Sequence, residues 1–152
     1  MAGTQTVASK IELFGANNDG QVVQYAYSGT GMCTKGEVMA LSGTSTDLRY
    51  VTQSRAKADT IAGIASQDCS GTDVGGANSL SVGLWTQGIF EGVISGTSIK
   101  PGDRLVSNCV TGSHNQLMVA TAAQSASGAP VVVGYTVQGG NANGVGAFRL
   151  NL

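Results

Sequence analysis

The organisation of the chain follows from residues 79–105, which read SLSVGLWTQGIFEGVISGTSIKPGDRL. Large apolar side chains recur there at even positions, namely Leu80, Val82, Leu84, Phe90 and Ile94. Polar side chains hold several odd positions, namely Ser79, Ser81, Gln87, Glu91 and Ser95. Because successive side chains of a strand point to opposite faces, this alternation predicts β-structure with one buried face. Strands usually run about 5–6 residues, so the stretch predicts two short strands, or one bent strand with glycine at the bend.

A tight turn in this stretch has a counterpart earlier in the chain. Residues 101–103 (PGD) favour a reversal because proline presets φ and glycine accepts positive φ. Residues 35–37 (KGE) form a similar signal before a short apolar run. After each turn the same parts recur: strand, turn, strand, small-residue segment and buried strand, the last at 60–64 and 131–135. This order predicts two similar halves on either side of the central stretch.

The composition of the 152-residue chain indicates one turn-rich β-domain. Glycine accounts for 23 residues, well above the average share of ~7%. Hydrophobic residues make up 41% of the chain, which is too many for a disordered protein. Only 11% of residues are charged and the net charge is −1, whereas a nucleic-acid partner would require a basic field. Many short strands separated by glycine turns predict an all-β fold, in the form of a small barrel.

Residues 1–20 are expected to form an N-terminal arm, and residues 21–152 the barrel-like domain. Most side chains of the arm are small or polar, and they bury too little apolar surface to offset the cost of ordering the backbone, ~1–2 kcal/mol per residue. We therefore expect residues 1 to about 15 to be poorly ordered in the free protein. Its alternating pattern predicts a strand without a partner, able to add to the sheet edge of a neighbouring protein. The side chains expected to make this contact are Val7, Ile11, Leu13 and Phe14.

The three cysteines are Cys33, Cys69 and Cys109. Their odd number and wide spacing predict three buried, reduced thiols, as in a protein made in a cytoplasm, rather than a disulfide framework or a zinc site. The first residues lack the apolar stretch of a signal peptide. No run approaches the ~18 apolar residues of a membrane-spanning helix, so we expect no membrane association.

The sequence contains no complete catalytic or cofactor-binding motif. His114, the single histidine, lies in a polar turn and is expected to be an exposed loop residue. Neither a Gly-x-Ser-x-Gly elbow, nor a phosphate-binding loop, nor a dinucleotide-binding glycine motif is present. With one histidine, a histidine-based metal site within the chain is not expected either. The sequence therefore predicts no enzyme, no cofactor and no metal.

Three residues of the central stretch, Trp85, Ile89 and Glu91, are predicted to contribute to an oligomer interface. Tryptophan is enriched at interface hot spots, although a place in the core and a role as a sugar-binding platform both remain open for Trp85. Glu91 is expected to pair with an arginine across the sheet or across a subunit interface, rather than to act as a catalytic acid.

Five turn-and-strand motifs lie between Tyr25 and Leu152, namely Lys35 to Leu41, Ile61 to Ala65, Gly88 to Val93, Lys100 to Leu105 and Val132 to Tyr135. Together they resemble the head decoration (cement) proteins of tailed bacteriophages. The resemblance implies a small β-barrel-like domain, often called a β-tulip, and usually a homotrimer. It also implies a position on the outside of the capsid at local three-fold positions, where the trimer clamps neighbouring capsomers.

The resemblance carries expectations about partners and activity. It implies a structural virion protein that is made in the host cytoplasm and binds the major capsid protein and copies of itself. The family offers no catalytic residues to carry over. The alternative is a lectin-like surface module of a phage that binds carbohydrate through Trp85 or through tyrosines, namely Tyr25, Tyr27 and Tyr50.

Overall fold

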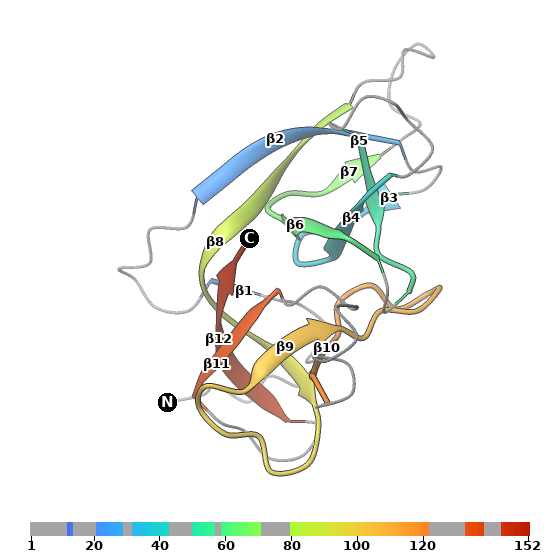
Figure 1. Cartoon of the computed structure of the whole chain (residues 1–152). Helices are drawn as coiled ribbons and strands as arrows, with labels where there is room; N and C mark the ends of the chain where they lie inside the picture. Colours follow the sequence, from blue (N-terminus) through green and yellow to red (C-terminus); the bar gives the residue numbers. More distant parts are fainter. Residues whose placement is uncertain are drawn as a thin grey trace.

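The computed structural model describes residues 12–13, 21–28, 32–42, 50–56, 59–70, 80–121, 133–138 and 144–152. Every regular element in these ranges is a β-strand, which confirms the all-β prediction (Figure 1). The strands are β1 (Glu12–Leu13), β2 (Gln21–Tyr27), β3 (Met32–Cys33), β4 (Val38–Leu41), β5 (Tyr50–Gln53), β6 (Ile61–Ala65), β7 (Cys69–Ser70), β8 (Leu80–Ser95), β9 (Arg104–Ser107), β10 (Leu117–Val119), β11 (Gly134–Gln138) and β12 (Val145–Asn151). No helix in the described ranges could span a membrane.

Strand β8 is the axis of the molecule and contacts strands from both ends of the chain. It is one continuous strand of 16 residues that curves through the molecule (Figure 1). Its first half pairs with β2 and β6, and its second half pairs with β12, β1 and β10. Gly88, at the change of partners, has a φ of 137°, a conformation that favours glycine. Of the two predictions for this stretch, the bent single strand is therefore the one observed.

The pairings around β8 close into two rings of strands that share β8. One ring runs β8–β2–β5–β4–β6 and returns to β8. The other runs β8–β12–β11–β9–β10 and also returns to β8. We call the first ring, with the beginning of β8, unit 1, and the second ring, with the end of β8, unit 2.

The two units repeat the same strand order and pairing. In unit 1 the strand β4 lies between β5 and β6, and in unit 2 the strand β9 lies between β10 and β11, all antiparallel. Each unit also contains one parallel pair, β2 with β5 in unit 1 and β8 with β10 in unit 2. Strand β8 is thus both the last strand of unit 1 and the first strand of unit 2.

The turns that open β4 and β9 are equivalent in detail. Gly36 and Gly102 occupy them with φ values of 91° and 90°, which non-glycine residues adopt only with strain. The N–H of Gly36 donates to the carbonyl of Ala65 at 2.8 Å, and the N–H of Gly102 donates to the carbonyl of Thr136 at 2.7 Å. The turn before β4 is therefore hydrogen-bonded to β6, and the turn before β9 is hydrogen-bonded to β11 at the equivalent position.

The core consists of two clusters, one on each side of the β4–β6 layer. The smaller cluster fills unit 1 and includes Met39, Val51, Val82 and Leu84. The larger cluster fills unit 2 with residues such as Phe90, Ile94, Leu105, Leu117 and Phe148, and unit 1 adds to it Val38, Ala40, Ile61, Ile64 and Trp85. One face of unit 1 therefore closes the core of unit 2. The even-numbered face predicted for β8 is buried, since its members Val82, Leu84, Phe90 and Ile94 have 0% exposure.

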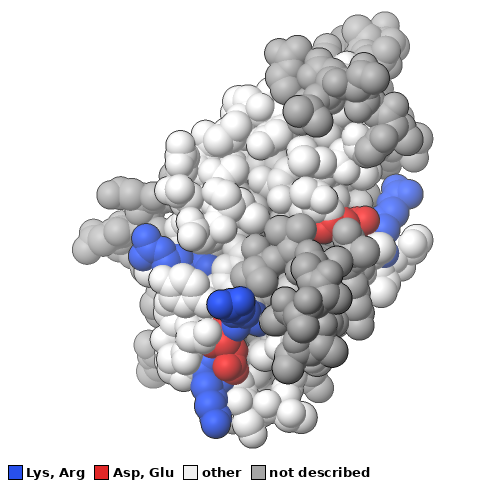
Figure 2. Space-filling view, in the orientation of Figure 1, with Lys and Arg blue, Asp and Glu red and all other residues white. Residues whose placement is uncertain are grey.

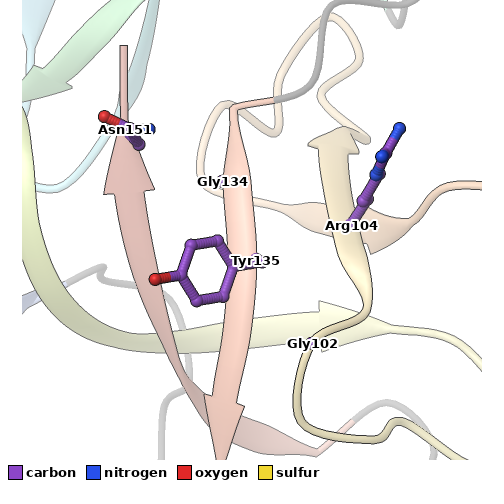
Figure 3. A pocket seen from close by; sticks show the side chains of 5 residues that line it. All are labelled: Gly102, Arg104, Gly134, Tyr135 and Asn151. Atoms are coloured by element: carbon purple, nitrogen blue, oxygen red, sulfur yellow. The ribbon is translucent and has the colours of Figure 1, made fainter.

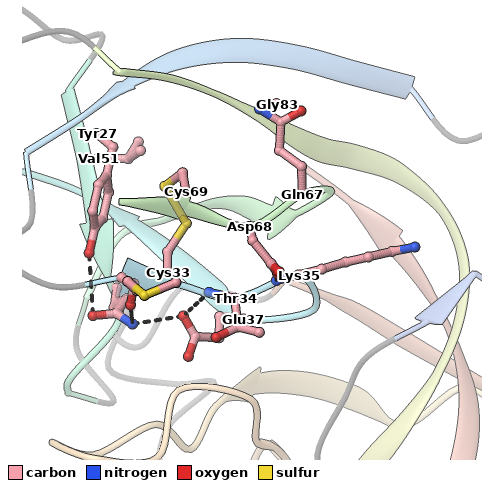
Figure 4. Close-up of a disulfide and its surroundings, with 12 residues drawn as sticks. Tyr27, Cys33, Thr34, Lys35, Glu37, Val51, Gln67, Asp68, Cys69 and Gly83 are labelled. Carbon is pink, nitrogen blue, oxygen red and sulfur yellow. Dashed lines mark hydrogen bonds between the residues drawn. A yellow bond between two sulfur atoms is a disulfide. The ribbon is translucent and has the colours of Figure 1, made fainter. Parts of the chain in front are cut away.

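A disulfide joins Cys33 to Cys69, so the prediction of three reduced thiols is wrong for this pair. The two cysteines are 36 positions apart in sequence, but β3 and β7 pair antiparallel and place them directly opposite each other. Their Cα atoms are 5.1 Å apart, within the usual range for a disulfide. Figure 4 shows the bond beside unit 1. Cys109 is a free thiol and is buried, as predicted.

Candidate functional site

His114 lies at the junction of the two units rather than in an exposed loop. Its Nδ1 is 2.6 Å from the carbonyl oxygen of Ser54, and its own carbonyl accepts a hydrogen bond from the Val38 N–H at 2.6 Å. His114 does lie in a loop, but the residue is half-buried, so the prediction that it is exposed is wrong. The ring faces a backbone carbonyl and not a hydroxyl, so this contact is not the nucleophile–base pair of a hydrolase.

A buried polar cluster lies beside His114 and also joins the units. The Ser54 hydroxyl is 3.1 Å from that of Ser107 and donates to Asp59 Oδ2 at 3.2 Å. The thiol of Cys109 donates to the Gln116 carbonyl at 3.5 Å. Burial raises the pKa of Cys109, and hydrogen bonds, among them one to Ser107, oppose this rise. Ser54, Ser107 and Cys109 are at most 1% exposed, so a substrate could not reach these nucleophiles.

Metal ligands do not gather in the described part of the chain, where no group of three His, Cys, Asp or Glu side chains could hold an ion. Several of the carboxylates there have local structural partners instead. Glu37 accepts from the Thr34 N–H at 2.9 Å, and Asp103 accepts from the Lys100 N–H at 2.7 Å. These carboxylates stabilise turns.

The predicted interface residues differ in how much surface they offer. Trp85 is only 8% exposed, because its ring packs 5.4 Å from that of Phe90 and the Lys35 Nζ lies 5.7 Å above it. Trp85 is therefore a core residue of the single chain and offers little area to a neighbour. Ile89 and Glu91 are half-buried. An interface role for these residues stays a prediction.

The predicted arm has a partner for two of its residues. Strand β1, Glu12–Leu13, pairs antiparallel with Glu91 and Phe90 of β8. The expectation of a strand without a partner in its own chain is therefore wrong for these two residues. The other predicted contact residues lie outside the described residues, namely Val7, Ile11 and Phe14. The division into an arm of residues 1–20 and a domain of residues 21–152 stays a prediction.

The tyrosines proposed as a sugar platform are not displayed together. Tyr27 is buried, and its hydroxyl donates to Gln53 Oε1 at 3.5 Å (Figure 4). Burial raises the pKa of Tyr27, the Glu37 carboxylate raises it further, and Arg55 opposes both. Tyr25 and Tyr50 are half-buried. Among the described aromatic residues Tyr135 is the most exposed, and it was not one of the tyrosines predicted to bind sugar.

Tyr135 lines a shallow pocket of about 240 Å³ on the outer face of unit 2. Figure 3 shows the ring on β11, with Arg104 on β9 to one side and Asn151 at the end of β12 to the other. Two glycines, Gly102 and Gly134, also line the pocket. One sequence signal could have found this place: the repeat aligns Tyr135 with Ile64 of unit 1, so an exposed aromatic replaces a buried aliphatic residue.

Comparison with known proteins shows similarity to solved structures but not to known sequences. No protein-family model matches the chain, and no curated protein sequence matches it. Among solved structures, the chain is similar to the N base of head fiber gp8.5 in bacteriophage phi29. The similarity has a TM-score of 0.51 at 15% sequence identity, and it covers 86% of this chain and 95% of that chain. At this identity the two chains share a fold, and the match supports the all-β architecture.

Proposed function

We propose that the chain is a structural protein of a tailed-phage virion. It binds the outer surface of the capsid as a homotrimer at local three-fold positions and stabilises the shell by clamping neighbouring capsomers. Its partners are the major capsid protein and copies of itself. In this proposal it catalyses no reaction and needs no cofactor or metal.

The observation that carries the proposal is the fold shared with the N base of a phage head fiber over almost the whole of that chain. The sequence motifs independently resemble another class of phage head protein, the decoration proteins. One line of support uses backbone geometry and the other uses turn-and-strand residues. Both lines of support point to proteins of the phage head, and for this reason we prefer a role in the virion.

The packing of the chain suits a passive structural role. Two rings share β8, and one face of unit 1 closes the core of unit 2. Among the described residues, no buried side-chain nitrogen or oxygen lacks a hydrogen-bond partner. The nucleophiles at the junction are buried, so that cluster serves the contact between the units. The lectin-like alternative is less well supported, since Tyr27 and Trp85 belong to the core.

Binding to heads is the direct test. Heads of the encoding phage, assembled without this chain, are mixed with the purified protein and sedimented, and the copy number per major capsid protein is measured. We expect saturable binding, a copy number that fits three-fold positions, and heads that resist heating better than bare heads. Absence of co-sedimentation at excess protein would sink the proposal, and saturable binding on a glycan array would favour the lectin-like alternative.

The oligomeric state is tested separately by mass photometry of the free protein and by imaging of decorated heads. We expect trimers in at least the decorated heads, because closed rings of identical subunits bury their interfaces without forming filaments. Isolated single copies on the shell would remove the trimer from the proposal and leave the capsid-binding role.

A further inference from the structure

Three exposed side chains form a row across unit 2. Tyr135 of β11 pairs directly with Arg104 of β9 on one side and with Arg149 of β12 on the other. Residues directly opposite each other in antiparallel strands place their side chains on the same face, with Cβ atoms about 5 Å apart. All three are exposed, and 41% of Tyr135 is accessible. We call Arg104, Tyr135 and Arg149 the arginine row.

Unit 1 contains an equivalent row at the same register. There Ile64 of β6 pairs with Val38 of β4 and with Trp85 of β8. All three side chains are buried and belong to the large cluster that also contains the interior of unit 2. In unit 1, therefore, this face is an interface, and its apolar side chains match the apolar surface that covers it.

In unit 2 the same face is open and its chemistry is different. Two guanidinium groups and a phenol replace two aliphatic side chains and an indole. In a chain with only 11% charged residues, two arginines flank Tyr135 on the open face. Most of the surface visible in Figure 2 is uncharged, with acidic groups beside some of the basic ones. Arginine and tyrosine are enriched in interface hot spots, and the arginine fork binds carboxylates through two parallel hydrogen bonds.

We propose that the arginine row is a docking surface for an acidic segment of another protein of the phage head. Carboxylates of the segment bind Arg104 and Arg149, and Tyr135 with the pocket beside it receives a side chain between them. This inference rests on the proposed function, and it adds the contact surface and the chemistry of the partner.

A second copy of this chain fits the row less well than an acidic partner. Two of its acids hold backbone N–H groups elsewhere: Asp59 accepts from the Arg55 N–H at 2.8 Å, and Asp68 accepts from the Lys35 N–H at 2.7 Å. Glu37 and Asp103 are held in their turns in the same way. Glu91 is half-buried and Asp68 is exposed, so the described part of the chain presents few fully accessible carboxylates to a neighbour. Charge complementarity therefore favours a different chain.

The test uses Arg104→Glu and Arg149→Glu, with Arg55→Glu as the matched control. Arg55 is also exposed, lies outside the row, and gives the same change in net charge. Binding to heads assembled without the chain is measured by sedimentation, and melting temperature verifies that each variant is folded. We expect each row variant to weaken binding at least about ten-fold and the control to stay within about two-fold of wild type. Raising NaCl from about 50 to about 500 mM should weaken wild-type binding more than that of the row variants.

Arg104→Lys keeps the charge but loses the fork, and it should bind less tightly than wild type and more tightly than Arg104→Glu. If both row variants bind like wild type, the row is not the contact and the proposed function survives. If the Arg55 control is weakened equally, binding follows net charge and the row is excluded. If wild type does not bind heads at all, the proposed function fails and this inference fails with it. Row-dependent binding to an acidic polysaccharide, without binding to heads, would also overturn it.

Discussion

Units 1 and 2 have the same strand order and pairing, but they differ in whether another part of the protein covers one of their faces. At equivalent positions of the same face, unit 1 has Val38, Ile64 and Trp85, and unit 2 has Arg104, Tyr135 and Arg149. The first set is buried against unit 2, whereas the second is exposed. The strand pairing therefore depends on the turns and on close contacts between strands. The side chains on the face that contains these residues differ because a neighbour covers this face in unit 1 and no described residue covers it in unit 2.

The largest loss of stability should come from replacing the two glycines at equivalent positions of β6 and β11, Gly63 and Gly134. A methyl group at Gly134 would overlap the carbonyl oxygen of Arg149, and one at Gly63 would lie 2.6 Å from the carbonyl oxygen of Trp85. Both obstacles are backbone atoms that cannot turn away. We expect Gly134→Ala to remove about 4 kcal/mol or more of stability, or to prevent folding, and Gly63→Ala to cost about 2–3 kcal/mol.

Urea unfolding measures both variants, with Gly112→Ala as the control. Nothing lies within 4 Å of a methyl group at Gly112, but its φ of 87° is unfavourable for alanine. The control should lose only about 1–2 kcal/mol. Losses at Gly134 and Gly63 no larger than at Gly112 would mean that these strands do not approach closely, and the equivalence of the two units would be broken there.

Trp85 and Arg149 occupy equivalent positions, but truncation should destabilise the protein strongly at Trp85 and hardly at all at Arg149. Trp85→Ala should cost about 3–5 kcal/mol, because it leaves a cavity where the ring packed on Phe90. Arg149→Ala should change stability by less than about 0.5 kcal/mol, because the side chain is exposed. Thermal and urea unfolding compare the two variants. Equal losses would contradict the assignment of a covered and an open face.

The disulfide stabilises unit 1 and has no counterpart among the described residues of unit 2. Its removal in the Cys33→Ala/Cys69→Ala variant should cost about 2–4 kcal/mol, since the bond closes a long loop of the unfolded chain. Dithiothreitol should lower the melting temperature of wild type and leave that of the variant unchanged. Mass spectrometry after alkylation of the unfolded, unreduced protein should find one reactive thiol, Cys109. Three reactive thiols would show that the bond is not formed.

The smallest effect concerns pH and the Cys109 thiol at the junction. Burial raises the pKa of this thiol in the folded state above its value in the unfolded chain. Between the two pKa values the unfolded state has lost the proton and the folded state keeps it, so stability falls as pH rises. The contribution is complete below about pH 8.5. It is lost above that pH, with a slope of at most about 1.4 kcal/mol per pH unit.

Cys109→Ala should flatten the decline in stability above that pH, although the variant is less stable at neutral pH because it leaves a small cavity. Urea midpoints of wild type and variant across the alkaline range provide the comparison. Parallel curves would show that another group causes the decline.

Local patterns predicted the features that depend on one segment. The alternation in the central stretch identified the buried face that contains Leu84 and Phe90, and the glycine turns identified where strands reverse. Features that depend on register between distant strands were not accessible. The cysteine pair requires β3 to lie beside β7, and the arginine row requires the register of β9, β11 and β12.

Trp85 illustrates a second limit of pattern analysis. It lies on the face of β8 opposite to Leu84, a face that alternation predicts to be exposed. Both residues are buried because β8 passes between two core clusters, Leu84 facing one and Trp85 the other. Where a strand has cores on both sides, as β8 has at Leu84 and Trp85, neither face is polar, and only the tertiary arrangement identifies such a place.

The sharing of β8 by two rings also has a consequence for the order of events during synthesis. When residues 80–95 leave the ribosome, β2 and β6 are available for the first half of the strand, but β12 has not yet been made. One edge of the second half then exposes unpaired backbone groups until Val145–Asn151 arrives, and such edges invite pairing with other chains. We expect unit 1 to fold first and unit 2 to be added from the preformed end of β8, so that aggregation of nascent chains concentrates between these two events.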